Sequence, residues 1–256
     1  MKKLNLYQLM LGIFVFYTLN CCKDKDNTAT PIAPTGSLEF HIHTNVGNSE
    51  VEEYGVEYYA NNRKMIIVKS QMYISGIELV KLDGNIVNAP NQSFLIENAN
   101  DEYKIVNLPV GNYRSIRFYV GLDEITNQKK AGISDTLINR ADMWFGNSAE
   151  PNKYVFLNFQ GSIDTTDAKN GSTLVNFDFK IGTISNRKQV FMPDLNFTIA
   201  ANQIAVLHMA ADYNRLFDGI NLTNNGNLIL NTTSDNSSDL AAKLVSNISL
   251  VLDYEK

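Results

Sequence analysis

The 256-residue sequence contains only two cysteines, Cys21 and Cys22, and none follows them. The region after Cys22 can therefore form neither an internal disulfide nor a thiolate metal site. Any metal ion bound in that region must be held by nitrogen, oxygen or thioether sulfur.

The sequence also lacks an excess of basic residues and a long apolar run. It has 22 Lys and Arg against 27 Asp and Glu, a formal charge of −5. This balance does not favour contact with phosphate backbones, so no nucleic-acid partner is expected. With 44% hydrophobic residues, 13 Phe and 12 Tyr, the composition is that of a folded, aromatic-rich domain.

The N-terminal residues have the layout of a secretory leader. Lys2 and Lys3 precede an apolar run over residues 9–17, which is too short to span a bilayer, and Leu19-Asn20-Cys21-Cys22 follows. This pattern predicts a lipoprotein signal peptide over 1–21, with Cys22 as the lipidated residue and Cys21 as the alternative acceptor. A secreted protein with two free thiols is the competing interpretation.

Residues 22–36 begin with two Lys-Asp pairs and continue with Pro and Thr. Such a segment predicts a flexible tether. Acidic residues directly after the cysteine resemble the surface-export tag of Bacteroidetes-type lipoproteins, although a solvated linker is an equal alternative. We therefore expect an outer-membrane lipoprotein, attached to the membrane by its lipid and facing the periplasm or the cell surface.

Residues 37–256 are predicted to form a single all-β domain. Leu38, Phe40 and Ile42 alternate with polar residues, which is typical of a strand with one buried face. The many further short strand candidates are separated by turns, and this punctuation favours an antiparallel β-sandwich. They cover residues 64–68, 71–81, 84–87, 94–97, 113–120, 154–159, 173–181, 189–191, 195–199 and 204–209.

Helix is sparse in the sequence. Ser237 and Ser238 can cap a segment in which Leu240, Leu244 and Ile248 have helical spacing, so a short C-terminal helix is expected. Residues 212–217 are expected to form a single turn. Two polar, Asn-rich stretches are weakly periodic. Residues 221–238 are expected to form a mobile loop, whereas residues 126–152 hold the only Trp and are not explained as a simple loop.

Motifs of common enzymes are missing. The sequence contains no Gly-rich phosphate loop and no Gly-x-Ser-x-Gly elbow. Adjacent carboxylates such as Glu52 and Glu53 are typical of solvated turns rather than of a glycosidase pair. An enzymatic activity is therefore not expected.

The three histidines are the best candidates for chemistry. His41 and His43 lie two residues apart on the predicted first strand and so project from one face, where they could share an ion with a ligand from a neighbouring strand. The competing interpretation leaves both in water. His208 lies in an apolar run over residues 204–211 and is expected to be at least partly buried; it or Met209 is the expected third ligand. Further thioethers are available from Met72, Met143 and Met192.

Several segments together resemble one protein family. They are Tyr73-Ile-Ser-Gly-Ile-Glu-Leu79 with Asp83-Gly84, Leu108-Pro-Val-Gly-Asn-Tyr-Arg-Ser-Ile-Arg-Phe118, Val120-Gly-Leu-Asp123, and Met143-Trp144 leading into Lys153-Tyr-Val-Phe-Leu-Asn-Phe-Gln-Gly161. In this order they are similar to the MbnP family of periplasmic and outer-membrane copper-binding proteins. The resemblance spans residues 38–254.

The resemblance implies a non-enzymatic copper-binding protein of the cell envelope. In methanotrophic members, imidazoles act with a tryptophan that a partner diheme enzyme oxidises to kynurenine. Trp144, the only tryptophan, corresponds by position, so the expected site is a copper ion held by His41, His43 and His208 with Trp144 as a redox-modified neighbour. A diheme peroxidase-like partner would then be expected. Alternatively, Trp144 plugs one end of the sandwich.

Two positions depart from the family pattern. Lys180 stands where related sequences often have His, and Lys153 replaces a Gly before Tyr154. These departures concern the metal site more than the fold. They keep open a second function, a surface adhesion module that contacts glycan or protein through its aromatic and Asn-rich loops and has lost the metal.

Overall fold

The computed structural model describes residues 33–60, 63–90 and 93–255. The predicted signal peptide over 1–21, both cysteines and most of the predicted tether over 22–36 lie outside this part. Residues Pro34–Lys256 form one compact unit. Its first strand begins at Thr35, two residues before the predicted boundary.

The smaller of two sheets is built around β1 (Thr35–Val46). Its strand order is β15-β13-β1-β2, and β7 also pairs with β1. β1 runs parallel to β13 and antiparallel to β7, so a strand from each half of the chain lies along it. The other members are β2 (Ser49–Glu50), β7 (Asn100–Pro109), β13 (Ile204–Asp212) and β15 (Leu252–Tyr254).

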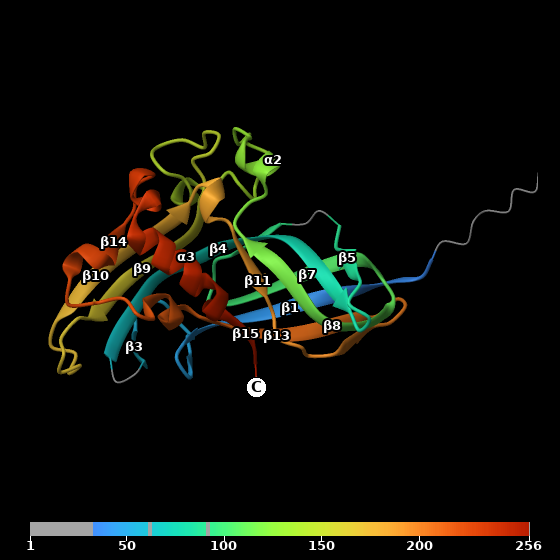
Figure 1. The fold of residues 1–256 in the computed structure, drawn as a ribbon, viewed down its shortest axis with the longest axis horizontal. Coiled ribbons are helices and arrows are strands. Elements are labelled where there is room, and N and C mark those ends of the chain that lie inside the picture. Colours follow the sequence, from blue (N-terminus) through green and yellow to red (C-terminus); the bar gives the residue numbers. More distant parts are fainter. Residues whose placement is uncertain (1–32, 61–62, 91–92, 256) are drawn as a thin grey trace, which may run out of the picture. The chain divides into compact units, whose positions relative to one another are not determined.

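The larger sheet is built around β4 (Arg63–Lys81), which joins two predicted strands into one of 19 residues (Figure 1). Its order is β11-β8-β4-β9-β10-β14; β12 also pairs with β8, and β3, β5 and β6 pair with β4. These strands are β3 (Glu57–Ala60), β5 (Ile86–Asn88), β6 (Phe94–Ile96), β8 (Gly111–Val120), β9 (Val155–Asp164), β10 (Leu174–Gly182), β11 (Lys188–Phe191), β12 (Phe197–Ile199) and β14 (Ile229–Leu230).

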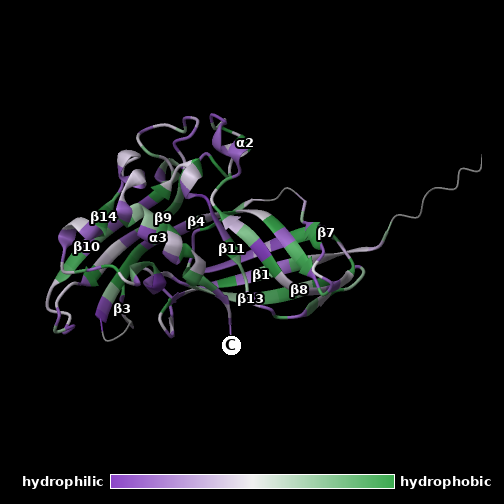
Figure 2. Ribbon diagram, viewed as in Figure 1, coloured by the Kyte–Doolittle hydropathy of each residue, from purple (hydrophilic) through white to green (hydrophobic). Residues whose placement is uncertain are grey.

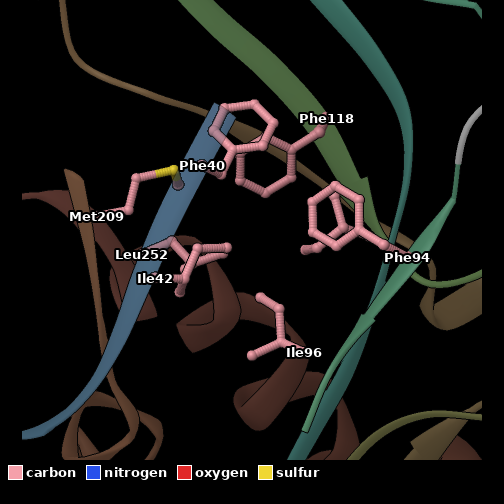
Figure 3. Close-up of a pocket in the computed structure, with 8 residues that line it drawn as sticks. Phe40, Ile42, Phe94, Ile96, Phe118, Met209 and Leu252 are labelled. Carbon is pink, nitrogen blue, oxygen red and sulfur yellow. The ribbon is translucent and has the colours of Figure 1, made fainter. Parts of the chain in front are cut away.

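The core lies between the two sheets. Along β1 buried and half-buried residues alternate without interruption, as predicted, and Figure 2 shows the same alternation of apolar and polar residues along β1 and β8. Phe40 is 2% exposed. Figure 3 shows Phe40, with Met209 of β13, facing Phe94 and Phe118 of the larger sheet.

The C-terminal helix is confirmed as α3 (Asp239–Val251). The Ser238 hydroxyl accepts a hydrogen bond from the backbone N–H of Ala241 at 3.2 Å and so caps the helix. Leu244 and Ile248 are buried in the core. The expected turn forms a 3-10 helix over Tyr213–Phe217. Four more 3-10 helices cover Ala141–Met143, Ile184–Asn186, Asn225–Leu228 and Ser234–Ser237.

The polar stretch over 126–152 is an anchored cover rather than a free loop. It begins within α2 (Glu124–Asn127) and lies over the outer face of the larger sheet, which we call the covered face. Tyr73 points to this side of β4, opposite to its neighbours in the core, and its hydroxyl donates to the Leu137 carbonyl at 3.0 Å. The Tyr154 hydroxyl donates to the Lys129 carbonyl at 2.7 Å.

Prediction and structure thus agree on an all-β sandwich with a short C-terminal helix. Two strand pairs, β1 with β13 and β10 with β14, are parallel rather than antiparallel. Apolar alternation reports which face of a strand is buried, not the direction of its neighbour, so it could not reveal this. Within the described part of the chain, no helix is long and apolar enough to cross a bilayer.

Candidate metal site

The outward face of the smaller sheet carries all three histidines, and we call it the histidine face. Glu39, His41 and His43 occupy alternate positions of β1 and point away from the core. The side chains of His41 and His43 are 23% and 22% exposed, so each is partly enclosed by its neighbours. The strand spacing predicted from the sequence therefore does put both imidazoles on one side.

His208 joins them from β13. It lies directly opposite His41 in the parallel pair, and the two rings meet edge to face with centroids 4.9 Å apart. His208 was expected to be buried or partly buried, but its side chain is 54% exposed. Its strand is apolar on both faces but only one face is covered, which also leaves Ile204 and Val206 partly exposed.

Two carboxylates meet His41. Its Nε2 atom lies 2.8 Å from Oε1 of Glu39, on the same strand, and 3.8 Å from Oε1 of Glu102, which faces it on β7. One donor atom from each of these three residues lies within 4.8 Å of the other two. Three N and O donors this close can bind a single ion.

Two other carboxylates meet His43. Its Nδ1 atom lies 3.1 Å from Oε1 of Glu50 and 3.0 Å from Oε1 of Glu255. The residue opposite His43 on β13 is Ala210, whose methyl group leaves room for Glu255 to reach across. Glu255 is fixed there by its backbone N–H, which donates to the His208 carbonyl at 3.1 Å.

The donor set fits a borderline divalent ion such as Cu(II) or Zn(II). Imidazole nitrogens and carboxylate oxygens suit these ions, whereas Cu(I) prefers sulfur. Met209, the alternative third ligand, points into the core on the opposite side of β13 from His208 (Figure 3). Met72 and Met192 are also core residues, and Met143 is buried in the cluster on the covered face.

The structure does not bring Trp144 to the histidines. Its indole N–H donates to the Ile138 carbonyl at 3.0 Å, and its backbone bridges to Tyr154. It packs against a cluster on the covered face, made of Tyr73, Leu95, Leu122, Ile138, Met143, Phe145, Ala149, Tyr154, Val155 and Phe156. Both sheets, stacked at a typical spacing of about 10 Å, lie between this cluster and the histidine face.

The polar groups beside Trp144 are already paired with each other. The Asp142 carboxylate accepts hydrogen bonds from Lys69 at 2.9 Å and Gln71 at 2.8 Å. Burial raises the pKa of Asp142, but these hydrogen bonds outweigh it and leave the pKa below its ordinary value. Asn158 donates to Gln71 at 3.1 Å.

The two departures from the family pattern lie on or beside this face. Lys180 pairs with Asn158 across the strands, so it shares the covered face, while Lys153 is exposed just before Tyr154. A lysine ammonium donates hydrogen bonds and has no lone pair for a metal. The residues around Trp144 therefore do not fit a copper ion, whereas those around His41 do.

None of the four glutamates of the histidine face, Glu39, Glu50, Glu102 and Glu255, was predicted as part of a site. Glu39 could have been predicted, because Glu39-x-His41-x-His43 continues the alternation that placed both histidines on one side. The other three glutamates could not have been predicted. β2, β7 and β15 were not predicted as strands. Glu50 lies in β2, Glu102 lies in β7, and Glu255 directly follows β15.

Comparison with solved structures gives MbnP from Methylosinus trichosporium as similar, with 13% sequence identity, a TM-score of 0.45, and coverage of 72% of this chain and 78% of that one. Comparison with curated proteins gives no significant match. A sequence model of the MbnP family matches residues 35–235, which is most of the chain and nearly all of the β-sandwich. The chain described here belongs to the MbnP family.

Proposed function

We propose that this protein is a non-enzymatic copper-binding protein of the cell envelope that captures Cu(II) on the histidine face. The ligands are imidazoles of His41, His43 and His208, assisted by the carboxylates that surround them. The observation that supports this most strongly is the meeting of three histidines from two distant strands with four glutamates from four different chain segments.

The chemistry of the site favours Cu(II) among the common divalent ions. Copper stands highest in the Irving–Williams order, so a site of modest geometry can hold it without thiolate help. Imidazole must be neutral to bind, so protons compete with the metal. Binding is expected to weaken as the pH falls toward and below about 6.5, the value for free histidine.

The expected place of action is the outer membrane, with the domain facing the periplasm or the cell surface. The leader-like residues 1–21 and the cysteine pair support lipid attachment at Cys22, with residues 22–36 as the tether. Radiolabelled palmitate should enter the wild-type protein and not the Cys21→Ser/Cys22→Ser variant. Equal labelling of the two proteins would refute the anchor without affecting the copper proposal.

The proposal does not require the diheme partner or the oxidation of Trp144. Those expectations came from methanotrophic relatives in which the tryptophan acts with the imidazoles. Here Trp144 lies on the covered face, so its modification would not change the ligands of His41. Exposure of this protein to a diheme peroxidase-like enzyme, followed by mass spectrometry of the Trp144 peptide, would test modification separately.

The deciding experiment is a Cu(II) titration of the chain carrying Cys21→Ser and Cys22→Ser, which we call the thiol-free chain. Both cysteines are replaced because free thiols would themselves bind copper. Adding His41→Ala and His43→Ala should weaken binding by at least about 100-fold, since even loss of a group that merely orients a ligand costs about 10–100-fold. Ser37→Ala, on the same face of β1, is the control and should change nothing. Unchanged affinity in the double histidine variant would exclude this site.

A second candidate function is adhesion to a glycan or protein. It is favoured by two isoleucines at the surface of the cover, Ile125 at 74% and Ile133 at 95% exposure. Exposed apolar side chains that gather into one patch can form a contact surface. If adhesion is the function, Ile125→Ser/Ile133→Ser should reduce attachment of cells to a glycan or protein surface, and the histidine variants should not.

A further inference from the structure

We infer that the histidine face binds two divalent ions per chain, in two subsites that share a wall formed by β1. The first subsite is Glu39, His41 and Glu102. The second is His43, Glu50 and Glu255, with His208 beside it. This inference rests on the proposed function and extends it from a single copper ion to a pair.

The first subsite has its own donors. Nε2 of His41 faces Glu39 at 2.8 Å and Glu102 at 3.8 Å, and all three donor atoms lie within 4.8 Å of one another. Two of these residues come from β1 and one from β7. Neither carboxylate is within ion-pair distance of another histidine.

The second subsite is centred on His43 and is more open than the first, because in the described part of the chain only Glu39, His41 and Glu102 have donor atoms that all lie within 4.8 Å of one another. Nδ1 of His43 lies 3.1 Å from Glu50 and 3.0 Å from Glu255. The other oxygen of Glu255 lies 3.9 Å from Nδ1 of His208, so this carboxylate faces two imidazoles at once. An ion here could take ligands from β1, β2, β13 and the residue after β15.

The spacing of the two subsites favours two ions over one. His41 and His43 are two residues apart on a strand, which separates their backbones by about 7 Å. Each imidazole turns toward a different pair of carboxylates, Glu39 and Glu102 for His41 and Glu50 and Glu255 for His43. One ion shared by both would have to leave at least two of the carboxylates without a metal.

The charge of the face is compatible with two ions. Its four glutamates carry four negative charges when ionised, and neutral imidazoles add none. One divalent ion would leave two of these charges uncompensated, whereas two ions neutralise all four. Further charges on the same face are Lys104, in register with Glu39, and Asp253, in register with Ala210, which offset each other. Asp212, in register with Asn45, is paired with Arg215.

Stoichiometry tests the inference directly. The thiol-free chain, dialysed against Zn(II) or Cu(II) and analysed for metal, should hold two ions. Glu39→Gln/Glu102→Gln should hold one, and Glu50→Gln/Glu255→Gln should also hold one. The control Glu124→Gln/Glu150→Gln removes the same charge from α2 and from the cover over the other sheet, and it should still hold two.

Electron paramagnetic resonance gives a second readout. Two Cu(II) ions at this spacing are close enough for magnetic coupling, so the wild-type sites filled with two equivalents should show a broadened spectrum with a half-field signal. Either glutamate pair variant should show an uncoupled spectrum of one Cu(II). The two variants should differ from each other in their spectra, because different ligands remain.

Each outcome decides between the claims. One ion in the otherwise wild-type thiol-free chain, or loss of all metal in either pair variant, would overturn the two-subsite inference and leave the proposed function intact. No metal at all in the thiol-free chain would overturn both. Glutamine matches glutamate in size and these positions face outward, so the variants should fold. The number of ions bound by the unsubstituted face decides the question even if a variant fails to fold.

Discussion

The two outer faces of the sandwich handle their polar groups in opposite ways. On the histidine face, carboxylates stand next to imidazoles, which can exchange a proton for a metal. On the covered face, Asp142 is held by Lys69 and Gln71 beneath residues 126–152, and Lys180 lies in register with Asn158. The first arrangement offers imidazole nitrogens beside carboxylate oxygens, whereas in the second the carboxylate already accepts hydrogen bonds from Lys69 and Gln71.

This difference shows which parts of a family resemblance can be transferred. The resemblance associated the tryptophan with the histidines, but in this chain they belong to different faces. The covered face keeps Trp144 and its aromatic surroundings as packing. The three histidines and the carboxylates beside them lie on the other sheet.

The largest expected effect comes from the strand that divides the core from the histidine face. Phe40→Ala should lower the free energy of unfolding by about 3–5 kcal/mol, because it removes a buried ring that contacts Phe94. His41→Ala, one residue along and outward, should cost less than about 1 kcal/mol. Urea unfolding followed by circular dichroism measures both, and equal losses would show that the two faces of β1 are wrongly assigned.

A smaller effect is expected on the covered face. Asp142→Asn removes the negative charge that accepts hydrogen bonds from Lys69 and Gln71. It should lower the free energy of unfolding by about 1–2 kcal/mol. Hydrogen bonds to charged groups are stronger than neutral ones, but the partial exposure of this pair weakens them. Trp144 fluorescence should shift to longer wavelength as the cover loosens. Asp135→Asn, on the same cover but away from Lys69, is the control.

Acid should act on the same contact. The pKa of Asp142 in the folded protein is lower than its ordinary value of 3.8 because the hydrogen bonds from Lys69 and Gln71 outweigh burial. A lowered pKa stabilises the fold fully above the ordinary value, and this contribution is lost as the pH falls through the folded-state value. Emission of Trp144 should therefore change below about pH 4 in the wild type, and less in Asp142→Asn. The same pH response in both proteins would assign it to other carboxylates.

The sequence predicted the features that depend on local pattern. Alternation along residues 38–43 correctly gave the buried face of β1, and the spacing of Leu244 and Ile248 correctly gave α3. It could not give the pairing of β1 with β13, because contact between residues 167 positions apart, such as His41 and His208, has no local signal. The position of His208 beside His41 follows from that pairing, and the position of Glu102 follows from the pairing of β1 with β7.

The sequence could not place Trp144 for a related reason. A single hydrophobic island in a polar stretch indicates that the island packs on something, but not on which face. Tyr73 decides it, since it points away from the core between two core residues and the cover packs on it. Alternation along β4 would have indicated this, but the run over residues 72–74 is apolar on both sides.

The smallest expected effect is on Trp144 itself. Trp144→Phe should leave Cu(II) affinity unchanged, because the indole lies beyond both sheets from the histidines and its N–H is bound to the Ile138 carbonyl. For the same reason, Cu(II) bound at the histidine face should quench the fluorescence of this single tryptophan only weakly, whereas an ion in contact with the indole would quench it strongly. Titration of the thiol-free chain, monitored by fluorescence and by direct metal analysis, separates the two cases. Strong quenching that saturates with the bound metal, together with weaker affinity in Trp144→Phe, would move the copper site to the covered face and reverse the comparison between the two faces.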